Sequence, residues 1–331
     1  MLLFISSCEQ KSGLTLAPEW QTKIISEWQD ELPDMLILSL DEKTLFISCE
    51  TTADMLAPSL IRIALDTGEK ETLLYGLGRA DGLKIDHKGD LWLGEEVDDG
   101  LIVHITSPAT IAPEQRLDRS RLVSSHPDII AVASAGRFSH EGMVFSKDHQ
   151  YLYLADEWSE GCLYRYTLDN KVLHVLHKTK GWLRINTPQD SRFKAEVLHG
   201  QYFDRLEDME LLPDGRILMA ETGSQDKQGR IWLLDDSNST PKVSSYLQHT
   251  DIKHPDNLEW DQKRHWLWIT DDSSPSKLWA WDGKNIKQIA SHRFAEITGV
   301  ETDHHGSVYF NLQHNIFGPD LTLKMNRSPK K

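Results

Sequence analysis

Two adjacent glutamates, Glu95 and Glu96, end a segment that reads as a buried strand in the stretch KIDHKGDLWLGEEVDDG. Apolar residues alternate on both sides of the turn cluster 86–89, which predicts a β-hairpin. More acid follows at Asp98 and Asp99. Carboxylates gathered in one place either keep protons at a raised pKa or share a cation, and Ca²⁺ takes about six to eight oxygen ligands. The acidic strand end therefore predicts a cation site.

The same plan of strand, turn and strand with a polar or acidic start and end occurs six times. The six copies begin at Pro33, Ala80, His140, Leu206, Pro255 and Ile297. Repeats of roughly 40 to 65 residues, with three visible strands and room for a fourth, are typical of propeller blades. We therefore expect an all-β fold, a six-bladed β-propeller, with loops at the insertions 106–139 and 172–204. A β-sandwich with coincidental hairpins is the alternative.

The repeats also position the acids. In a hairpin, residues equidistant from the turn lie side by side, and the innermost strands of a propeller line its channel. The expected pairs are Asp34 with Glu50, Asp81 with Glu95, Glu141 with Asp156, Glu207 with Glu221, and Asp256 with Asp271. The sixth copy has Thr298 and Asn311 instead. All six ends should meet at one mouth and bind Ca²⁺ there, unless the acids are hydrated at the blade rims.

Composition narrows the class of protein. The formal charge of −15 argues against nucleic acid as a partner, because such binding needs a basic footprint. Three cysteines provide neither a disulfide framework nor zinc-ligand spacing. We expect one propeller domain over residues 18–331, and a monomer.

The first residues, MLLFISSCEQ, resemble the lipobox of bacterial lipoproteins. On that reading residues 1–17 are a leader or tether, Cys8 is acylated, and the protein is held at the membrane in the periplasm or cell envelope. The alternative is an ordinary apolar start, because the apolar run is short for a signal peptide.

Several longer stretches resemble the PhoX-like alkaline phosphatase family. The stretch SAGRFSHEGMVFSKDHQYLYLADEWSEGCLYRY is similar to one of its signatures. The stretches ADGLKIDHKGDLWLGEEV, RLEDMELLPDGRILMAETG, HPDNLEWDQKRHWLWITDD and AEITGVETDHHGSVYFNLQH resemble others in the family's order. Together they cover roughly residues 30 to 315.

The resemblance implies a six-bladed propeller that hydrolyses phosphate monoesters at a cluster of Ca²⁺ and iron in the channel mouth. It implies that Arg205 holds the phosphate of a small anionic substrate. His140, next to Glu141, is a further catalytic candidate. The expected metal ligands, with Asp256 added from the repeat pattern, are Glu50, Glu95, Glu96, Glu141, Asp156, Glu207, Asp256 and Glu296.

The chain departs from the family at one ligand. The family's iron-binding cysteine falls on Gly94, so Ca²⁺ is expected and iron is doubtful unless Cys49 stands in for that thiolate. Two other functions stay open. One is a lactonase or esterase of the gluconolactonase type, which shares the fold and a central Ca²⁺. The other is a non-catalytic, envelope-associated binding propeller.

Overall fold

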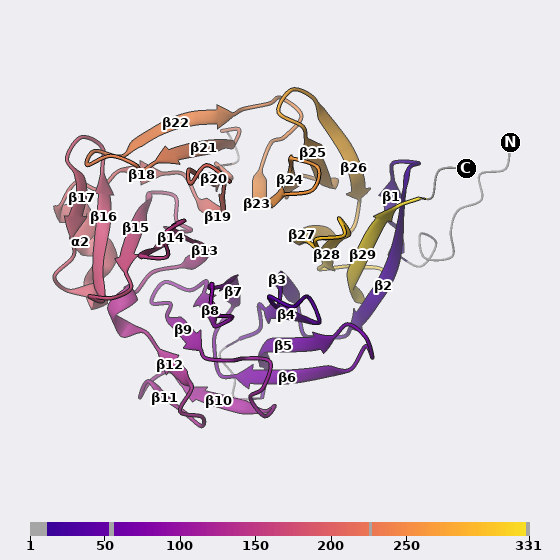
Figure 1. The fold of residues 1–331 in the computed structure, drawn as a ribbon, viewed down its shortest axis with the longest axis horizontal. Helices are drawn as coiled ribbons and strands as arrows, with labels where there is room; N and C mark the ends of the chain where they lie inside the picture. Colours follow the sequence, from indigo (N-terminus) through magenta and orange to yellow (C-terminus); the bar gives the residue numbers. More distant parts are fainter. Residues whose placement is uncertain (1–11, 53–55, 225–226, 329–331) are drawn as a thin grey trace, which may run out of the picture.

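Six sheets, antiparallel apart from one parallel pair, surround a central channel in the computed structural model, which describes residues 12–52, 56–224 and 227–328 (Figure 1). This arrangement confirms the predicted six-bladed β-propeller. Each blade starts at the channel with the hairpin recognised in the sequence, because strong alternation of apolar residues around a tight turn specifies such a hairpin locally. The core lies between neighbouring blades.

The strands of each blade follow in order from the channel outward. Blade one is β3 (Pro33–Leu38), β4 (Thr44–Cys49), β5 (Pro58–Ala64) and β6 (Lys70–Tyr75), extended by β10 (Gln115–Asp118) and β11 (Val123–Ser124). Blade two is β7 (Ala80–Ile85), β8 (Leu91–Glu95), β9 (Ile102–Ile105) and β12 (Ile129–Ala131). Blade three is β13 (His140–Phe145), β14 (Tyr151–Asp156), β15 (Gly161–Thr167), β16 (Val172–His177) and β17 (Gly181–Arg184), with β18 (Tyr202–Phe203) paired to β15.

The remaining three blades have four strands of the ring each. Blade four is β19 (Leu206–Leu211), β20 (Ile217–Glu221), β21 (Arg230–Asp235) and β22 (Lys242–Leu247). Blade five is β23 (Pro255–Asp261), β24 (Trp266–Asp271), β25 (Ser276–Trp281) and β26 (Ile286–His292), with β1 (Thr15–Leu16) outside it. Blade six is β27 (Glu296–Thr302), β28 (Val308–Gln313), β29 (Asp320–Arg327) and β2 (Trp20–Trp28).

The two ends of the chain close the ring together. Strand β2 is the outer strand of blade six and pairs with β29 along its whole length. Trp28 is fully buried at this seam, and its Nε1 donates a hydrogen bond of 2.9 Å to Thr322 Oγ1. Strand β1, which falls inside the stretch expected to be a leader, pairs with β26 of blade five. Cys8 lies outside the described residues.

The two insertions are more ordered than predicted. Strand β12, in the first insertion, is the fourth strand of blade two, and β10 pairs with β6 of blade one. The second insertion contains β16, β17, β18 and helix α2 (Ser191–Val197). The expectation of plain loops is therefore wrong, because outer strands pair with distant segments and carry little local signal.

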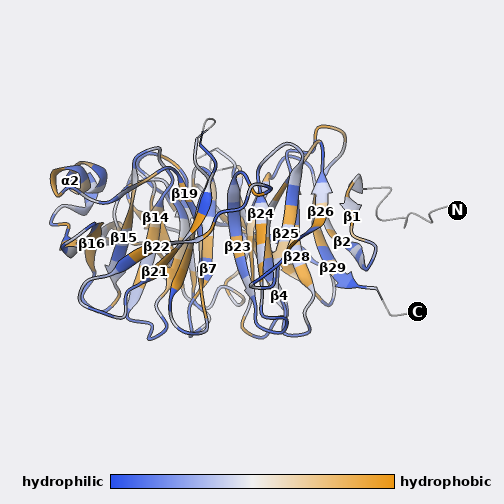
Figure 2. Ribbon diagram, turned by 90° about the horizontal axis from the view of Figure 1, so that it is seen from above, coloured by the Kyte–Doolittle hydropathy of each residue, from blue (hydrophilic) through white to orange (hydrophobic). Residues whose placement is uncertain are grey.

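Apolar side chains fill the spaces between blades. Between blades five and six, Trp20 and Trp268 meet edge to face with ring centroids 5.5 Å apart, next to Phe310 and Leu323. Figure 2 shows hydrophobic colour along the strands and hydrophilic colour in the loops at both ends of the ring. Among the described helices, none is long and apolar enough to cross a membrane.

Candidate active site at the channel mouth

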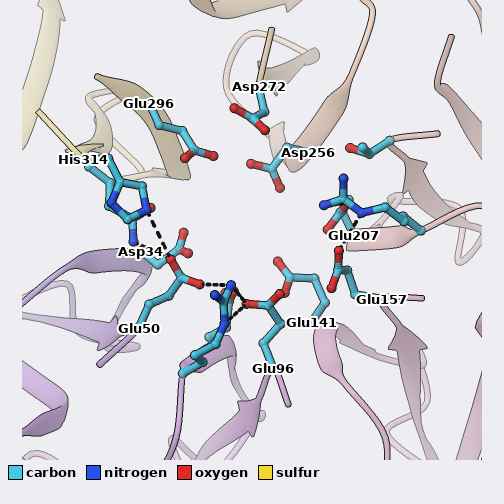
Figure 3. Close-up of a pocket in the computed structure, with 15 residues that line it drawn as sticks. Asp34, Glu50, Glu96, Glu141, Glu157, Glu207, Asp256, Asp272, Glu296 and His314 are labelled. Atoms are coloured by element: carbon cyan, nitrogen blue, oxygen red, sulfur yellow. Dashed lines mark hydrogen bonds and ion pairs between the residues drawn. The ribbon is translucent and has the colours of Figure 1, made fainter. Parts of the chain in front are cut away.

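A cavity of about 180 Å³ opens at one mouth of the channel, with its side chains pointing inward from all six blades (Figure 3). Ten of the lining residues are acidic: Asp34, Glu50, Asp81, Glu96, Glu141, Glu157, Glu207, Asp256, Asp272 and Glu296. The others are Arg79, Arg205, Thr222, Gln313 and His314.

In five of the six blades a β-bulge places one acid of the innermost strand in this cavity. In blade two, Ala80 is opposite Glu95 and Leu83 is opposite Leu93, so two residues of β7 face a single residue of β8. Asp81 is the first of these two residues, and a bulge of this kind redirects its side chain. The same shift occurs in blades one, three, four and five. The bulged acids are Asp34, Asp81, Glu141, Glu207 and Asp256.

Two of these bulges need glycine at the next position. A Cβ at Gly82 would lie 1.8 Å from the backbone oxygen of Glu141 in the next blade, and a Cβ at Gly142 would lie 2.2 Å from that of Glu207. No side chain fits at such distances, so the glycines let neighbouring bulges stack around the channel. The stacking brings Glu141 close to the acids on either side.

In blades two to five the second ring of lining residues comes one position later than predicted, whereas in blade one Glu50 lies where it was predicted and in blade six His314 lines the cavity instead of Asn311. The second ring consists of the residues that follow the second strand of each blade: Glu50, Glu96, Glu157, Thr222, Asp272 and His314. The prediction assumed hairpins without a bulge; in blade two the bulge pairs Glu95 with Ala80, and Glu96 lies just beyond the end of β8. The expected partners Glu95, Asp156, Glu221 and Asp271 end their strands but do not line the cavity.

The cavity thus brings together seven of the predicted site residues, while three lie elsewhere. Those at the mouth are Glu50, Glu96, Glu141, Arg205, Glu207, Asp256 and Glu296. Glu95 is fully buried beneath it: its Oε1 accepts a 2.8 Å hydrogen bond from the Gly78 N–H, and its Oε2 accepts a 3.0 Å bond from the Leu101 N–H. Arg119 also pairs with Glu95 at 3.1 Å. The Glu95 carboxylate is therefore fully engaged away from the cavity.

Asp156 and His140 are also held apart from the cavity. Arg192 donates to both carboxylate oxygens of Asp156 at 2.6 to 3.0 Å. His140 is fully buried, with its ring centroid 3.9 Å from that of Phe138. Burial lowers the pKa of His140 to about 3, so the imidazole is neutral at any physiological pH. In this place His140 packs between blades two and three and does not reach the cavity.

Burial and mutual repulsion raise the pKa of the mouth carboxyls. Burial is the larger cause, followed by neighbouring acids, and the pKa reaches about 8 for Asp34 and Glu207 and about 9 for Glu296. The pKa values of Asp81 and Glu141 are raised well above the ordinary range for the same reasons. Without a cation, several of these groups hold their protons at neutral pH.

Two arginines offset part of this charge. Arg205 donates from Nε to Glu157 at 2.6 Å and pairs with Glu207 at 3.2 Å. Arg79 donates from Nε to Glu96 at 2.8 Å and also pairs with Glu50. Their side chains remain 42% and 51% exposed, so each guanidinium keeps an open edge toward the solvent side of the mouth.

A different cluster of acids lies deeper in the channel, three positions further along the innermost strands. Glu210, Glu259 and Glu301 belong to it, and burial raises their pKa values, to about 7 for Glu210 and about 8 for Glu301. Lys84 stands 3.5 Å from Glu210 and compensates part of their charge. The mouth differs from this deeper cluster because its two basic side chains, Arg79 and Arg205, are partly exposed to solvent.

The donor set of the mouth fits Ca²⁺. Three overlapping groups of acids each offer ligand oxygens within 4.8 Å of one another: Asp34 with Glu50 and Asp81, Asp81 with Glu96 and Glu141, and Glu141 with Glu207 and Asp256. Asp81 Oδ1 and Glu141 Oε2 are buried, and neither atom has a hydrogen-bond partner among the described residues. Buried carboxylate oxygens without donors are what a hard cation satisfies.

Thiolate-bound iron does not fit this mouth. A Cβ at Gly94 would lie 2.6 Å from the His140 backbone oxygen, so position 94 has no room for a cysteine. Cys49 is fully buried in the apolar core of blade one, and burial raises the pKa of its thiol far above the ordinary value. Cys49 is therefore a core residue and is not among the residues that line the mouth.

Sequence reasoning missed several lining residues. Arg79 precedes an innermost strand by one residue, as Arg205 does, and the parallel between "RAD" and "RLE" could have revealed it. The pairs Asp81–Gly82 and Glu141–Gly142 carry the signal of a bulge, since glycine inside a strand pattern often marks one.

Comparison with known proteins shows the fold. No protein-family model matches the chain, and no curated protein matches it. Solved structures do match: Pseudomonas fluorescens PhoX in complex with vanadate has a TM-score of 0.72 at 12% identity, over 95% of this chain and 96% of that one. A gluconolactonase from Xanthomonas campestris has a TM-score of 0.62 at 11% identity, over 95% and 91% of the two chains.

A calcium structure of a Trichoderma reesei carbohydrate-active enzyme of family AA12 is a third match. Its TM-score is 0.60 at 10% identity, over 95% of this chain and 97% of that one. What these proteins share with this chain is a propeller fold. At such low identity the likeness extends to the fold alone, and the activity has to be argued from the site.

Proposed function

We propose that the protein is a Ca²⁺-dependent hydrolase of phosphate esters that acts at the channel mouth. The observation that carries the proposal is the pair of half-exposed arginines, Arg79 and Arg205, at the rim of a buried set of carboxylates. Carboxylates alone would repel a phosphate. A guanidinium pairs with two phosphate oxygens at once, so the rim supplies what an anionic substrate needs.

The acids that pair with Arg205 hold it in place. Its Nε is bound to Glu157 and one terminal nitrogen to Glu207, so the planar group cannot rotate freely. For its other terminal nitrogen no partner is found in the described part of the chain, and this group would stabilise charge that develops on a phosphoryl group, the usual task of an arginine in phosphoryl transfer. Arg79 offers the same chemistry from blade two.

Beneath the arginines, Asp81, Glu141, Glu207 and Asp256 would hold Ca²⁺. When bound, Ca²⁺ supplies a Lewis acid for the phosphoryl oxygens. The cavity measures about 180 Å³, below the roughly 300 to 1,000 Å³ of pockets that enclose a whole small molecule. The mouth therefore suits the phosphoryl end of a substrate, with the rest of the molecule outside.

The test is hydrolysis of p-nitrophenyl phosphate by protein stripped with a chelator and resupplied with Ca²⁺, with and without iron. We expect Ca²⁺ alone to restore activity, and Arg205→Ala to lower kcat/KM by about 10² to 10³. Arg216→Ala is the matched control, because Arg216 pairs with Asp214 in an exposed turn outside the cavity. Activity that needs iron, or equal effects of both substitutions, would contradict the proposal.

A lactonase or esterase of the gluconolactonase type is the second candidate, favoured by the fold it shares with the Xanthomonas campestris enzyme. Asn257 is the asparagine nearest in sequence to the mouth acids. Its Oδ1 accepts a 2.6 Å hydrogen bond from the Gly299 N–H and a 3.0 Å bond from Thr270 Oγ1. The Asn257 oxygen is therefore already hydrogen-bonded within the protein. Turnover of a sugar lactone without turnover of the phosphate ester would favour this candidate.

A binding propeller without turnover is the third outcome, and Ca²⁺ binding without hydrolysis of either substrate would support it. Lipidation at Cys8, a place in the cell envelope and a monomeric state stay predictions from the sequence.

A further inference from the structure

A larger chamber lies away from the mouth, between blades two and three. Its volume is about 810 Å³, within the range of pockets that bind small molecules. It is lined by the hairpin turns of the two blades, at the opposite ends of the innermost strands from the acid ring. Its walls combine the aromatic side chains Trp92, Phe145 and Tyr166 with polar groups from the turns.

Three ligating side chains converge on one side of this chamber. Asp86 and Asp90 belong to the turn between β7 and β8, and His104 lies on β9, directly opposite Trp92. One ligand atom from each of the three lies within 4.8 Å of the other two. Two carboxylates and one imidazole form a mixed oxygen and nitrogen set, which suits a borderline transition metal better than Ca²⁺.

Backbone N–H groups bind one oxygen of each of the two carboxylates. Asp86 Oδ1 accepts hydrogen bonds from the N–H groups of Lys88, at 2.8 Å, and of Asp90, at 3.1 Å. Asp90 Oδ1 accepts a 3.0 Å bond from the Ser107 N–H. Such bonds orient a carboxylate as the outer contacts of metal ligands do. The geometry is set before any ion arrives.

The contact between His104 and Asp90 is that of two ligands rather than of a hydrogen-bonded pair. Nε2 of His104 is 3.4 Å from Asp90 Oδ2, yet this buried nitrogen makes no hydrogen bond within the described part of the chain. In a tetrahedral zinc site with bonds of about 2.0 to 2.2 Å, neighbouring ligand atoms stand about 3.4 Å apart. The His104 ring is held in place against Trp92, with centroids 4.5 Å apart.

Trp92 provides a separate sign of an occupant. It lines the chamber and is only 7% exposed, and its Nε1 has no hydrogen-bond partner among the residues described. A buried indole N–H normally has an acceptor. A ligand in the chamber with an oxygen acceptor would provide one.

We infer that Asp86, Asp90 and His104 form a second metal site, for a Zn²⁺-type cation, with an open coordination position facing the chamber. A small ligand bearing an acceptor oxygen, such as a carboxylate, would occupy that position beside Trp92. Three protein ligands with an open position distinguish sites that bind or transform ligands from purely structural zinc sites. This site is independent of the function proposed for the mouth.

The test is equilibrium dialysis of the full chain against Co²⁺, a spectroscopic substitute for Zn²⁺, with the mouth saturated by Ca²⁺. We expect one bound Co²⁺ with a visible ligand-field spectrum that Zn²⁺ removes. His104→Gln and Asp90→Asn should each weaken binding at least tenfold. His305→Gln, an exposed turn histidine, is the matched control and should bind as the parent does.

Thermal melting without metal checks the folding of each variant, and a variant that does not fold is replaced by Asp86→Asn. Failure to bind Co²⁺, or binding that His104→Gln leaves unchanged, would overturn the inference. Glu207→Gln separates the two sites: it should leave Co²⁺ binding intact whether or not the mouth hydrolyses phosphate esters.

Discussion

Glu296→Gln should stabilise the metal-free protein, with an effect that grows as the pH rises. Glu296 lines the mouth, and no ion pair to a cationic side chain is found for it among the described residues, so the substitution breaks no salt bridge. Burial, and then the neighbouring acids Asp272, Asp34, Glu50 and Glu207, raise its pKa from 4.5 to about 9.

The magnitude follows from linkage. At pH 7 the unfolded chain ionises Glu296 while the folded chain keeps it protonated, and at about 1.4 kcal/mol per pH unit above 4.5 this costs the folded state about 3 kcal/mol. Neighbouring acids share the repulsion, so we expect the free energy of unfolding to rise by about 1 to 3 kcal/mol in the variant. For a chain of this length that is roughly 2 to 4 °C in Tm.

The difference in unfolding free energy between the variant and the parent should depend on pH. Because the folded pKa lies above the unfolded one, the parent has this stability in full below about pH 4.5 and loses it as the pH rises toward 9. Glutamine does not titrate, so the advantage of the variant should vanish below about pH 4 and increase over that window. Saturating Ca²⁺ should narrow the difference, because a cation bound by the neighbouring acids offsets the repulsion that raises the pKa of Glu296.

The assay is thermal or urea unfolding in chelator and in Ca²⁺ at several pH values. Glu69→Gln is the control, since Glu69 is exposed in the turn between β5 and β6 and should show no pH-dependent difference. An equal loss of stability at every pH in chelator would refute the reasoning, because it would mean that the mouth stabilises an ionised Glu296 without a cation.

Three further substitutions test the packing around the site. Cys49→Ala should cost about 1 kcal/mol and leave bound metal unchanged by elemental analysis; loss of bound iron would make Cys49 a ligand after all. Gly94→Ala should lower the free energy of unfolding in urea by about 2 kcal/mol or more, because its Cβ would lie 2.6 Å from the His140 backbone oxygen. An unchanged urea midpoint would show that blades two and three can move apart. Trp28→Ala should cost about 3 to 5 kcal/mol by the same measurement, and a loss under 1 kcal/mol would show that the β2 seam contributes little.

The hairpins of the fold could be predicted and the outer strands could not. Each innermost pair, such as β7 with β8, is joined by a short turn and carries its own alternation, so its pattern is visible in one window. Strand β12 reaches its partner β9 only after the excursion through β10 and β11. Pairing between strands so far apart in the sequence depends on the whole ring, so it produces no periodic pattern in the local sequence.

The predicted acids gather at one end of the channel, with an error of one residue in the second ring of four blades. Glu50 and Glu96 were expected at the mouth and line it, whereas Glu95 and Asp156 were also expected there and do not. The predicted pairs assumed hairpins without bulges, whereas the bulges pair Glu95 with Ala80 and Asp156 with His140. Successive residues of a strand face opposite sides of the sheet, so neighbouring positions differ in what they face. Gly82 shows that the bulge of blade two has a local signal in the sequence, although the close contact that requires glycine there is made with blade three.

The closure of blade six sets an order of events during synthesis. Strand β2 leaves the ribosome before all six innermost hairpins, while its partner β29 follows them. Until then β2, with the sequence WQTKIISEW, has an unpaired edge that another nascent copy could occupy. Slow release of the C-terminal segment should therefore favour strand-exchanged assemblies over closed rings, and a circular permutant that joins β2 to β29 in one hairpin should escape this hazard.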